Sequence, residues 1–122
     1  MTKQASTIII PADPAEPVRR ETVTADLDTA QGIVGGWLEG LPSNTDEGWA
    51  AYGNEEAKIL GLPVNPRAHQ TLVTLGGHDP QDVLRGNVFI VGIDDEGEWV
   101  DTPVEVWGKV LAIPGVATAS AE

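Results

Sequence analysis

The sequence predicts an α+β domain in which a mixed or antiparallel β-sheet is covered by about three helices. Short β-branched and apolar runs, typical of strands, are interspersed with segments whose apolar residues recur at helical spacing. The chain has 122 residues, 41% of them hydrophobic, which suits a single domain with one real core. The expected order is β-β-α-β-β-α-β-α, and its hairpins at the start and in the middle favour α+β over a regular β-α alternation.

Five segments have the composition of strands. They are Ser6–Ile10, Val18–Thr24, Trp49–Asn54, Ala57–Leu62 as a hairpin partner of Trp49–Asn54, and Asn87–Ile93. The three consecutive isoleucines of the first and the nearly continuous apolar run of the last predict strands that are buried on both faces. A short partner strand is expected to begin in "EWV", after the acidic turn that follows residue 93.

The first helix is expected over residues 25–41, where leucine, valine and tryptophan residues recur three and four positions apart. Asp26 or Asp28 can cap its N-terminus. The adjacent Gly35 and Gly36 weaken this helix, and two explanations compete for them. One is close packing of the backbone against the sheet, and the other is exposure of backbone amides to a ligand.

The second and third helices have clearer start signals. The second is expected to follow Asn65, an N-cap residue that stands before a proline. The third is expected to follow Thr102, which forms a capping-box pattern with Glu105. Residues 1–113 therefore make the expected single domain, and residues 114–122, which have no pattern, the expected flexible C-terminal tail.

Charge is the strongest feature of the composition. Nineteen acidic residues against seven basic ones give a formal net charge of −12. Binding to a nucleic-acid backbone needs lysines and arginines to neutralise phosphates, so direct nucleic-acid binding is not expected. Such a charge would attract a basic protein, or a protein that itself binds nucleic acid, although solubility alone also explains an acidic surface.

Other features of the sequence indicate where in the cell the protein is expected. The chain has no cysteine, which excludes disulfides and thiol catalysis. It has no apolar run of about 18 residues, so a membrane-spanning helix is not expected. The short apolar run near the N-terminus does not resemble a signal peptide. A cytoplasmic location is the simplest expectation.

Polar side chains of recognisable chemical use gather around two turns of the chain. They are Asn54, Glu55, Glu56, Asn65, Arg67 and Arg85. One interpretation is a structural clamp, in which one of the two arginines pairs with one of the two glutamates. The other is a pocket in which these groups hold a small molecule or a nucleotide. An enzyme is the least expected use, because adjacent carboxylates on a strand point to opposite faces.

No catalytic residue, metal site or cofactor is predicted. The chain lacks the glycine-rich nucleotide-binding motifs and the nucleophile-elbow motif. Its two histidines, His69 and His78, match no defined metal-binding spacing, and both are expected to be exposed.

The four tryptophans fall into two pairs. Trp37 and Trp107 continue helical stripes and are expected in the core. Trp49 and Trp99 stand at strand starts beside acidic turns and are expected to be partly exposed. Exposed tryptophans anchor partners, so these two are the candidate interaction surface, and they make a homodimer plausible.

Three segments, "VGGWLEGL", "NEEAKILGLPVNPRA" and "DVLRGNVFIVG", occur in an order that resembles an uncharacterised family of bacteria and their phages, domain of unknown function 3846. The resemblance spans Ile8 to Leu111, and Ala57 departs from it, since the family pattern has glycine there. The matching positions are Asn54, Glu55, Glu56, Lys58, Leu60, Asn65, Arg67 and Gly86. The resemblance implies a phage or prophage accessory protein inside a bacterial cell, and it implies no reaction, ligand or catalytic residue.

The leading functional hypothesis is therefore a small acidic, non-enzymatic binding protein that engages a host or phage protein. The alternative is a small-molecule or nucleotide-binding domain built on the cluster of glutamates, arginines and asparagines.

Overall fold

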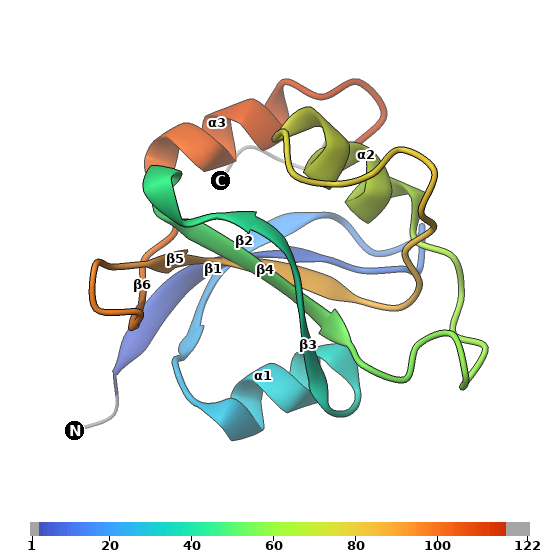
Figure 1. The fold of residues 1–122 in the computed structure, drawn as a ribbon, viewed down its shortest axis with the longest axis horizontal. Helices are drawn as coiled ribbons and strands as arrows, with labels where there is room; N and C mark the ends of the chain where they lie inside the picture. The colour runs from blue at the N-terminus through green and yellow to red at the C-terminus, as the bar shows by residue number, and fades with distance from the viewer. Residues whose placement is uncertain (1–2, 117–122) are drawn as a thin grey trace.

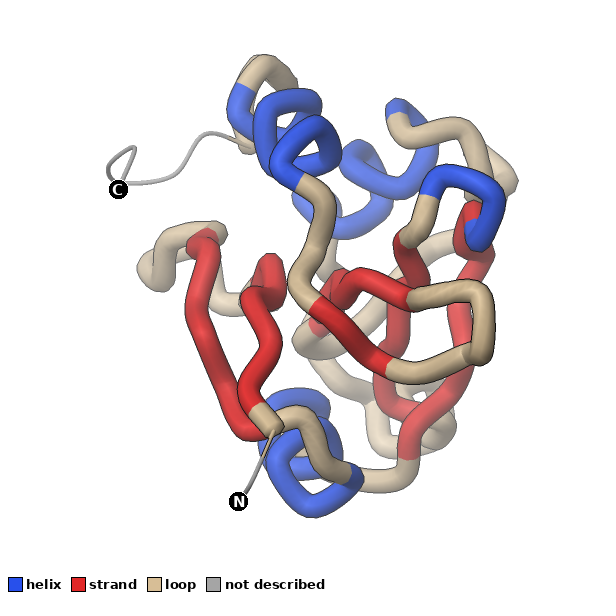
Figure 2. The backbone as a smooth tube through the Cα atoms, turned by 90° about the vertical axis from the view of Figure 1, so that its left-hand side faces the viewer, coloured by secondary structure: helices blue, strands red, loops and turns tan. Residues whose placement is uncertain are grey.

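The computed structural model describes residues 3–116, which form three layers (Figure 1). A six-stranded antiparallel sheet has one helix on one face and two helices on the other. Figure 2 shows the same layering after a quarter turn, with one helix below the strands and the others above them. The predicted α+β class is confirmed.

The strands are β1 (Gln4–Ile10), β2 (Arg19–Thr24), β3 (Leu38–Asn44), β4 (Trp49–Asn54), β5 (Val88–Ile93) and β6 (Trp99–Val100). The helices are α1 (Leu27–Val34), α2 (Pro66–Thr74) and α3 (Val104–Leu111), and a single 3-10 turn covers Thr45–Glu47. None of these helices has the length and apolar character needed to cross a bilayer, within the part of the chain that the structure describes.

The sheet has the order β2-β1-β5-β4-β3, and β6 pairs with the far end of β5. β5 is therefore central, and its residues Val88 to Gly92 are all buried, as their continuous apolar run predicted. The isoleucines of β1 are also buried on both faces. Ile8 and Ile10 pack towards α2 and α3, whereas Ile9 packs towards α1.

Two apolar cores hold the layers together. The larger one, between the sheet and the pair α2 and α3, includes the fully buried Trp49, Leu72 and Val110. The smaller one, between the sheet and α1, includes Phe89 and Val34. Burial of an apolar side chain of this size contributes roughly 1.5–3 kcal/mol, so the two cores dominate the stability of the fold.

The prediction of one helix over residues 25–41 is wrong beyond Val34. Gly35 adopts a φ of 81°, closes α1 through its N–H bond to Gln31, and lets the chain turn into β3. A left-handed conformation suits glycine because it has no Cβ. Trp37, expected in the core, stands just before β3 and is 65% exposed.

The expected strand over Ala57–Leu62 is also wrong, because this segment forms consecutive turns. The side chain of Asn54 accepts a hydrogen bond from the N–H of Glu56, which bends the chain at the end of β4. Gly61, with a φ of 65°, continues the turn. The hairpin partner of β4 is instead β3, which precedes it, so the predicted element order is recovered with a different strand.

The helix starts follow prediction in two of three cases. Asp26 caps α1 through Thr29, and Asn65 caps α2 through Ala68. The predicted capping box of α3 is wrong, because the buried hydroxyl of Thr102 donates to strand carbonyls instead and Pro103 occupies the cap position.

The expected tail, residues 114–122, lies largely outside the described residues. Val116, the last one described, is fully buried in the larger core, and Gln70 on α2 donates to the carbonyl of Pro114.

A candidate cleft beside β3

Asn65 serves the architecture. It is fully buried, and its Nδ2 donates to the carbonyl oxygens of Ile10 at 2.9 Å and Gly86 at 2.8 Å. Its Oδ1 accepts the α2 cap bond from Ala68 at 3.0 Å. One side chain therefore ties the start of α2 to the end of β1 and to the turn before β5. Both hydrogens of the amide are already used, so Asn65 has no donor left for a ligand.

Arg67 has a similar structural role. Its Nη2 donates to the carbonyl oxygens of Pro11 at 2.7 Å and Asp13 at 3.0 Å, which fixes the proline-rich loop between β1 and β2 against α2. Arg85 donates through Nη1 to the carbonyl of Leu62 at 3.1 Å. The predicted clamp is wrong, because within residues 3–116 neither arginine pairs with a carboxylate.

Asn54 explains Gly36, the second glycine of the pair after α1. It is 3% exposed, and its Nδ2 donates to the carbonyl of Val34 at 3.1 Å. A Cβ on Gly36 would lie 2.9 Å from that nitrogen, so only glycine leaves room for it. The N–H groups of Gly35 and Gly36 both bond to Gln31. These amides are not open to a ligand. Gly36 packs closely, although against the Asn54 side chain and not as helix backbone against the sheet, whereas Gly35 is needed for its left-handed conformation.

The predicted residues Asn54, Glu55 and Arg85 line one open cleft of about 250 Å³. Its walls come from β3, from the turn after β4 and from the loop before β5. The other lining residues are Glu39, Gly40, Leu41, Pro42, Gly53, Ala57, Lys58, Ile59, Asp82, Val83, Leu84 and Val88. Glu56, Asn65 and Arg67 do not line it.

Gly53 shapes the floor of this cleft. A Cβ there would lie 3.3 Å from the Leu41 side chain and 3.8 Å from that of Val88, so the glycine allows Leu41 to lie across β4. Glu39 pairs with Gly53 in the sheet, and Glu55 follows two positions later on β4's line. Both glutamates line the cleft. Both residues are exposed, and neither has a cationic partner among the described residues.

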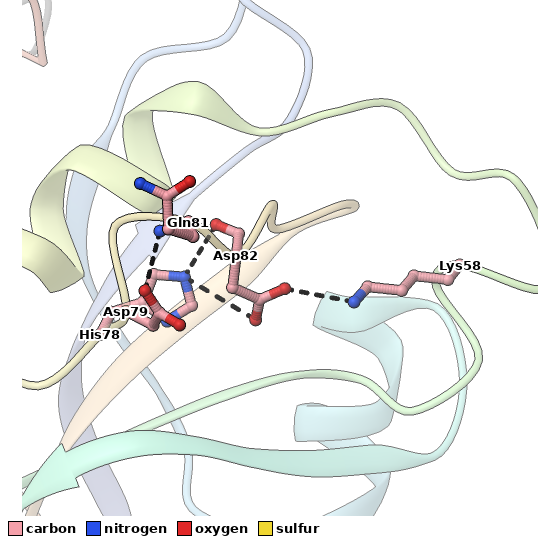
Figure 3. A network of polar contacts seen from close by, with 5 residues as sticks. All are labelled: Lys58, His78, Asp79, Gln81 and Asp82. Atoms are coloured by element: carbon pink, nitrogen blue, oxygen red, sulfur yellow. Dashed lines mark hydrogen bonds and ion pairs between the residues drawn. The ribbon is translucent and has the colours of Figure 1, made fainter.

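Lys58 and Asp82, which both line the cleft, belong to a polar network (Figure 3). Lys58 Nζ donates to Asp82 Oδ1 at 3.2 Å, joining the turn after β4 to the loop before β5. The hydrogen bond from Lys58 lowers the pKa of Asp82 below its ordinary value of 3.8. His78 Nε2 lies 3.2 Å from the Asp82 carbonyl oxygen, so this nitrogen carries the donated hydrogen.

The two histidines lie together. The rings of His69 and His78 are 5.3 Å apart and nearly perpendicular. His78 is buried and His69 half-buried, so the expectation that both are exposed is wrong. Across residues 3–116, no three histidine or carboxylate side chains are arranged to hold a metal ion.

The predicted tryptophan surface is not formed as expected. Trp49 is fully buried in the larger core, so it cannot contact a partner, and the prediction of its exposure is wrong. Trp99 is half-buried against Phe89, and its Nε1 donates to the hydroxyl of Tyr52 at 3.2 Å. Both tryptophans stand at strand starts, where the side chain of a first residue already points into a core.

Exposed apolar side chains occur instead around the cleft. Ile59 is 84% exposed and Val83 47% exposed, and both line it. Leu60 and Val64 are exposed on the turn and loop that follow Ile59. Sequence reasoning missed these residues because the apolar run around Ile59 was interpreted as a strand. The signal was present in the polar residues before it and in Gly61 after it, which together favour a turn.

Residues 6–112, most of the chain, match the family model of a domain of unknown function, DUF3846. Comparison with curated proteins and with solved structures found no match.

Proposed function

Since the chain belongs to the DUF3846 family, whose function is unknown, we propose its function from the cleft: it is a non-enzymatic protein that binds another protein through the cleft beside β3. The setting that we propose is the cytoplasm of a bacterial cell, where it acts as a phage or prophage accessory protein on a host or phage partner.

One observation carries the proposal. Ile59 and Val83 are exposed on two walls of a cleft that Glu39 and Glu55 also line. Exposed apolar side chains that gather in one place and are bordered by polar groups are the pattern of a protein-binding site. An isolated exposed isoleucine would need no explanation, but this one lies beside a second apolar side chain and a hollow.

The alternative, a small-molecule or nucleotide site, has less support. The cleft volume of about 250 Å³ is below the range of roughly 300–1,000 Å³ that is usual for such sites. Lys58 is bonded to Asp82, and Arg85 is bonded to a backbone carbonyl. Asn65 and Arg67, which the alternative required, bind backbone groups elsewhere.

A capture experiment with matched variants tests the proposal. The double variant Ile59→Ser/Val83→Ser removes the apolar rim, and Val104→Ser removes a similar side chain, 66% exposed on α3. We expect the wild type and Val104→Ser to retain the same bacterial protein at low salt, and the double variant to lose it. Retention should weaken as salt rises, because exposed charges are screened over about 10 Å at 0.1 M. Equal retention by all three proteins, or none even at low salt, would contradict the proposal.

A further inference from the structure

The outer edge of β3 has free backbone groups. Within the described residues β3 pairs only with β4, so it ends the sheet. The carbonyl oxygen of Trp37, the residue before β3, accepts a hydrogen bond from the N–H of Glu55. The backbone polar groups of Trp37 therefore face the β4 side. Since backbone groups alternate in direction along an antiparallel strand, the N–H and C=O groups of Leu38 and Gly40 face away from the sheet. Such a row can pair with a strand from another chain.

This free edge is short and continues into the cleft. A register shift between Leu41 and Asn44 and the proline at position 42 end regular pairing there. The same residues, from Glu39 to Pro42, form one wall of the cleft. A chain that paired with Leu38 and Gly40 would therefore lie beside the hollow that holds Ile59 and Val83.

The opposite edge, β2, is protected in a way that β3 is not. β2 begins with Arg19, Arg20 and Glu21, and Arg19 Nε lies 2.8 Å from Glu21 Oε1. Charged side chains along an edge are a common protection against pairing with another chain. The free part of β3 has only Glu39 as a charged residue and includes the exposed Gly40.

We propose that an extended, basic segment of the partner protein adds to β3 as a further strand, with apolar side chains in the cleft and its cations at Glu39 and Glu55. The inference rests on the proposed function and specifies the class of partner. Backbone hydrogen bonds would supply affinity, and the cleft would select side chains, as in other cases of strand addition.

Charge selects this occupant over a second copy of the chain. Glu39 and Glu55 are exposed, line the same cleft and carry the same charge, so a cation is favoured there and a further anion is not. The two cations of the cleft do not neutralise this charge, since Lys58 is paired with Asp82 and Arg85 with the carbonyl of Leu62. A second copy would bring another β3 glutamate and another net charge of −12 to the same edge.

The test uses a synthetic peptide probe of alternating arginine and valine, about eight residues long, which is ordinary strand length. Three further peptides serve as comparisons: one with glutamate in place of arginine, one with N-methyl groups on alternate backbone amides, and one with those groups on the other amides. Binding is followed by amide chemical shifts and hydrogen exchange of the isotope-labelled full chain.

Two sets of variants separate backbone pairing from charge. Gly40→Pro removes one outward N–H, and no atom lies within 4 Å of the position a Cβ would take. The loss of one hydrogen bond is expected to weaken binding of the basic peptide about two- to tenfold. Glu39→Gln/Glu55→Gln leaves the backbone unchanged and is expected to weaken binding of the basic peptide roughly three- to tenfold. Glu96→Gln/Glu98→Gln, in the turn before β6, removes the same charge and should change nothing.

Each outcome decides the matter. Strand addition is supported if the basic peptide protects the Leu38 and Gly40 amides from exchange and if one of the two N-methylated peptides does not. Binding of the basic peptide should also be weaker in Gly40→Pro. Binding that ignores N-methylation and Gly40→Pro overturns it. If no peptide binds, strand addition fails, while partner loss in Ile59→Ser/Val83→Ser would still uphold the proposed function. If the protein alone forms a dimer in sedimentation that Gly40→Pro weakens, the occupant is a second copy and the proposal is wrong.

Discussion

Replacing Asn65 with alanine is expected to destabilise the fold by about 3–7 kcal/mol. The variant loses the cap of α2, a loss that typically costs about 1 kcal/mol. It also leaves the buried carbonyls of Ile10 and Gly86 without the donors that now lie 2.9 and 2.8 Å away. An unsatisfied buried acceptor costs about 1–3 kcal/mol. Since a domain of this size is stable by only about 5–15 kcal/mol, the variant should be close to unfolding at room temperature.

Urea unfolding followed by tryptophan fluorescence measures this loss, because Trp49 is fully buried in the native state. Asn65→Ser keeps an oxygen for the cap but loses both amide N–H donors, so it should recover only about 1 kcal/mol of the alanine loss. Asn65→Asp should recover none, because a carboxylate oxygen would face two carbonyl oxygens. A loss of less than about 1 kcal/mol in the alanine variant would refute the structural role and return Asn65 to the candidates for ligand binding.

Three further predictions concern other parts of the fold. Gly92→Ala should cost about 3 kcal/mol or more in urea unfolding, since its Cβ would overlap the carbonyl oxygen of Asp101 and push β6 from β5; a smaller loss would contradict this packing. The pKa of Asp82 is lowered by Lys58, so its contribution to stability is present above the unfolded value near 3.9 and is lost as pH falls through the lower folded value. Asp82→Asn should remove this acid dependence, which is at most a few tenths of a kcal/mol for so exposed a pair, and an unchanged profile in stability titrations would argue against it. Trp37→Ser should change stability by less than about 1 kcal/mol, whereas a loss above ~2 kcal/mol would place the ring in the core.

Local patterns predicted those parts of the fold that local chemistry determines. The buried runs of β1 and β5, the turn-bounded β4 and the Asn65 cap of α2 all depend on residues a few positions apart. Trp37 shows where this reasoning ends. Together with Leu38 and Leu41 it continues the three- and four-residue spacing of α1, yet Gly35 adopts a left-handed conformation and the chain leaves the helix. Which of two compatible patterns forms was decided by pairing with β4, and a local window does not contain that contact.

Prediction of the candidate site from local sequence was limited in the same way. The polar cluster was correctly located around the turns after β4 and before α2, but its members separated once the contacts of each side chain were known. Asn54, Asn65 and Arg67 bind backbone carbonyls that lie between about 20 and 56 residues away in sequence. Polar side chains at the ends of strands and helices are needed both to satisfy such carbonyls and to bind ligands, so residue type alone does not distinguish the two uses.

The separation also explains why the cleft is where it is. Asn54 binds Val34 at the end of α1 and bends the chain after β4, which directs Ile59 into solvent instead of into a hairpin. The position of Ile59 at the rim of the cleft therefore depends on this buried amide. A change at Asn54 should affect partner binding and stability together, whereas changes at Ile59 or Glu39 should affect binding alone, and this difference separates the residues that build the site from those that would contact a partner.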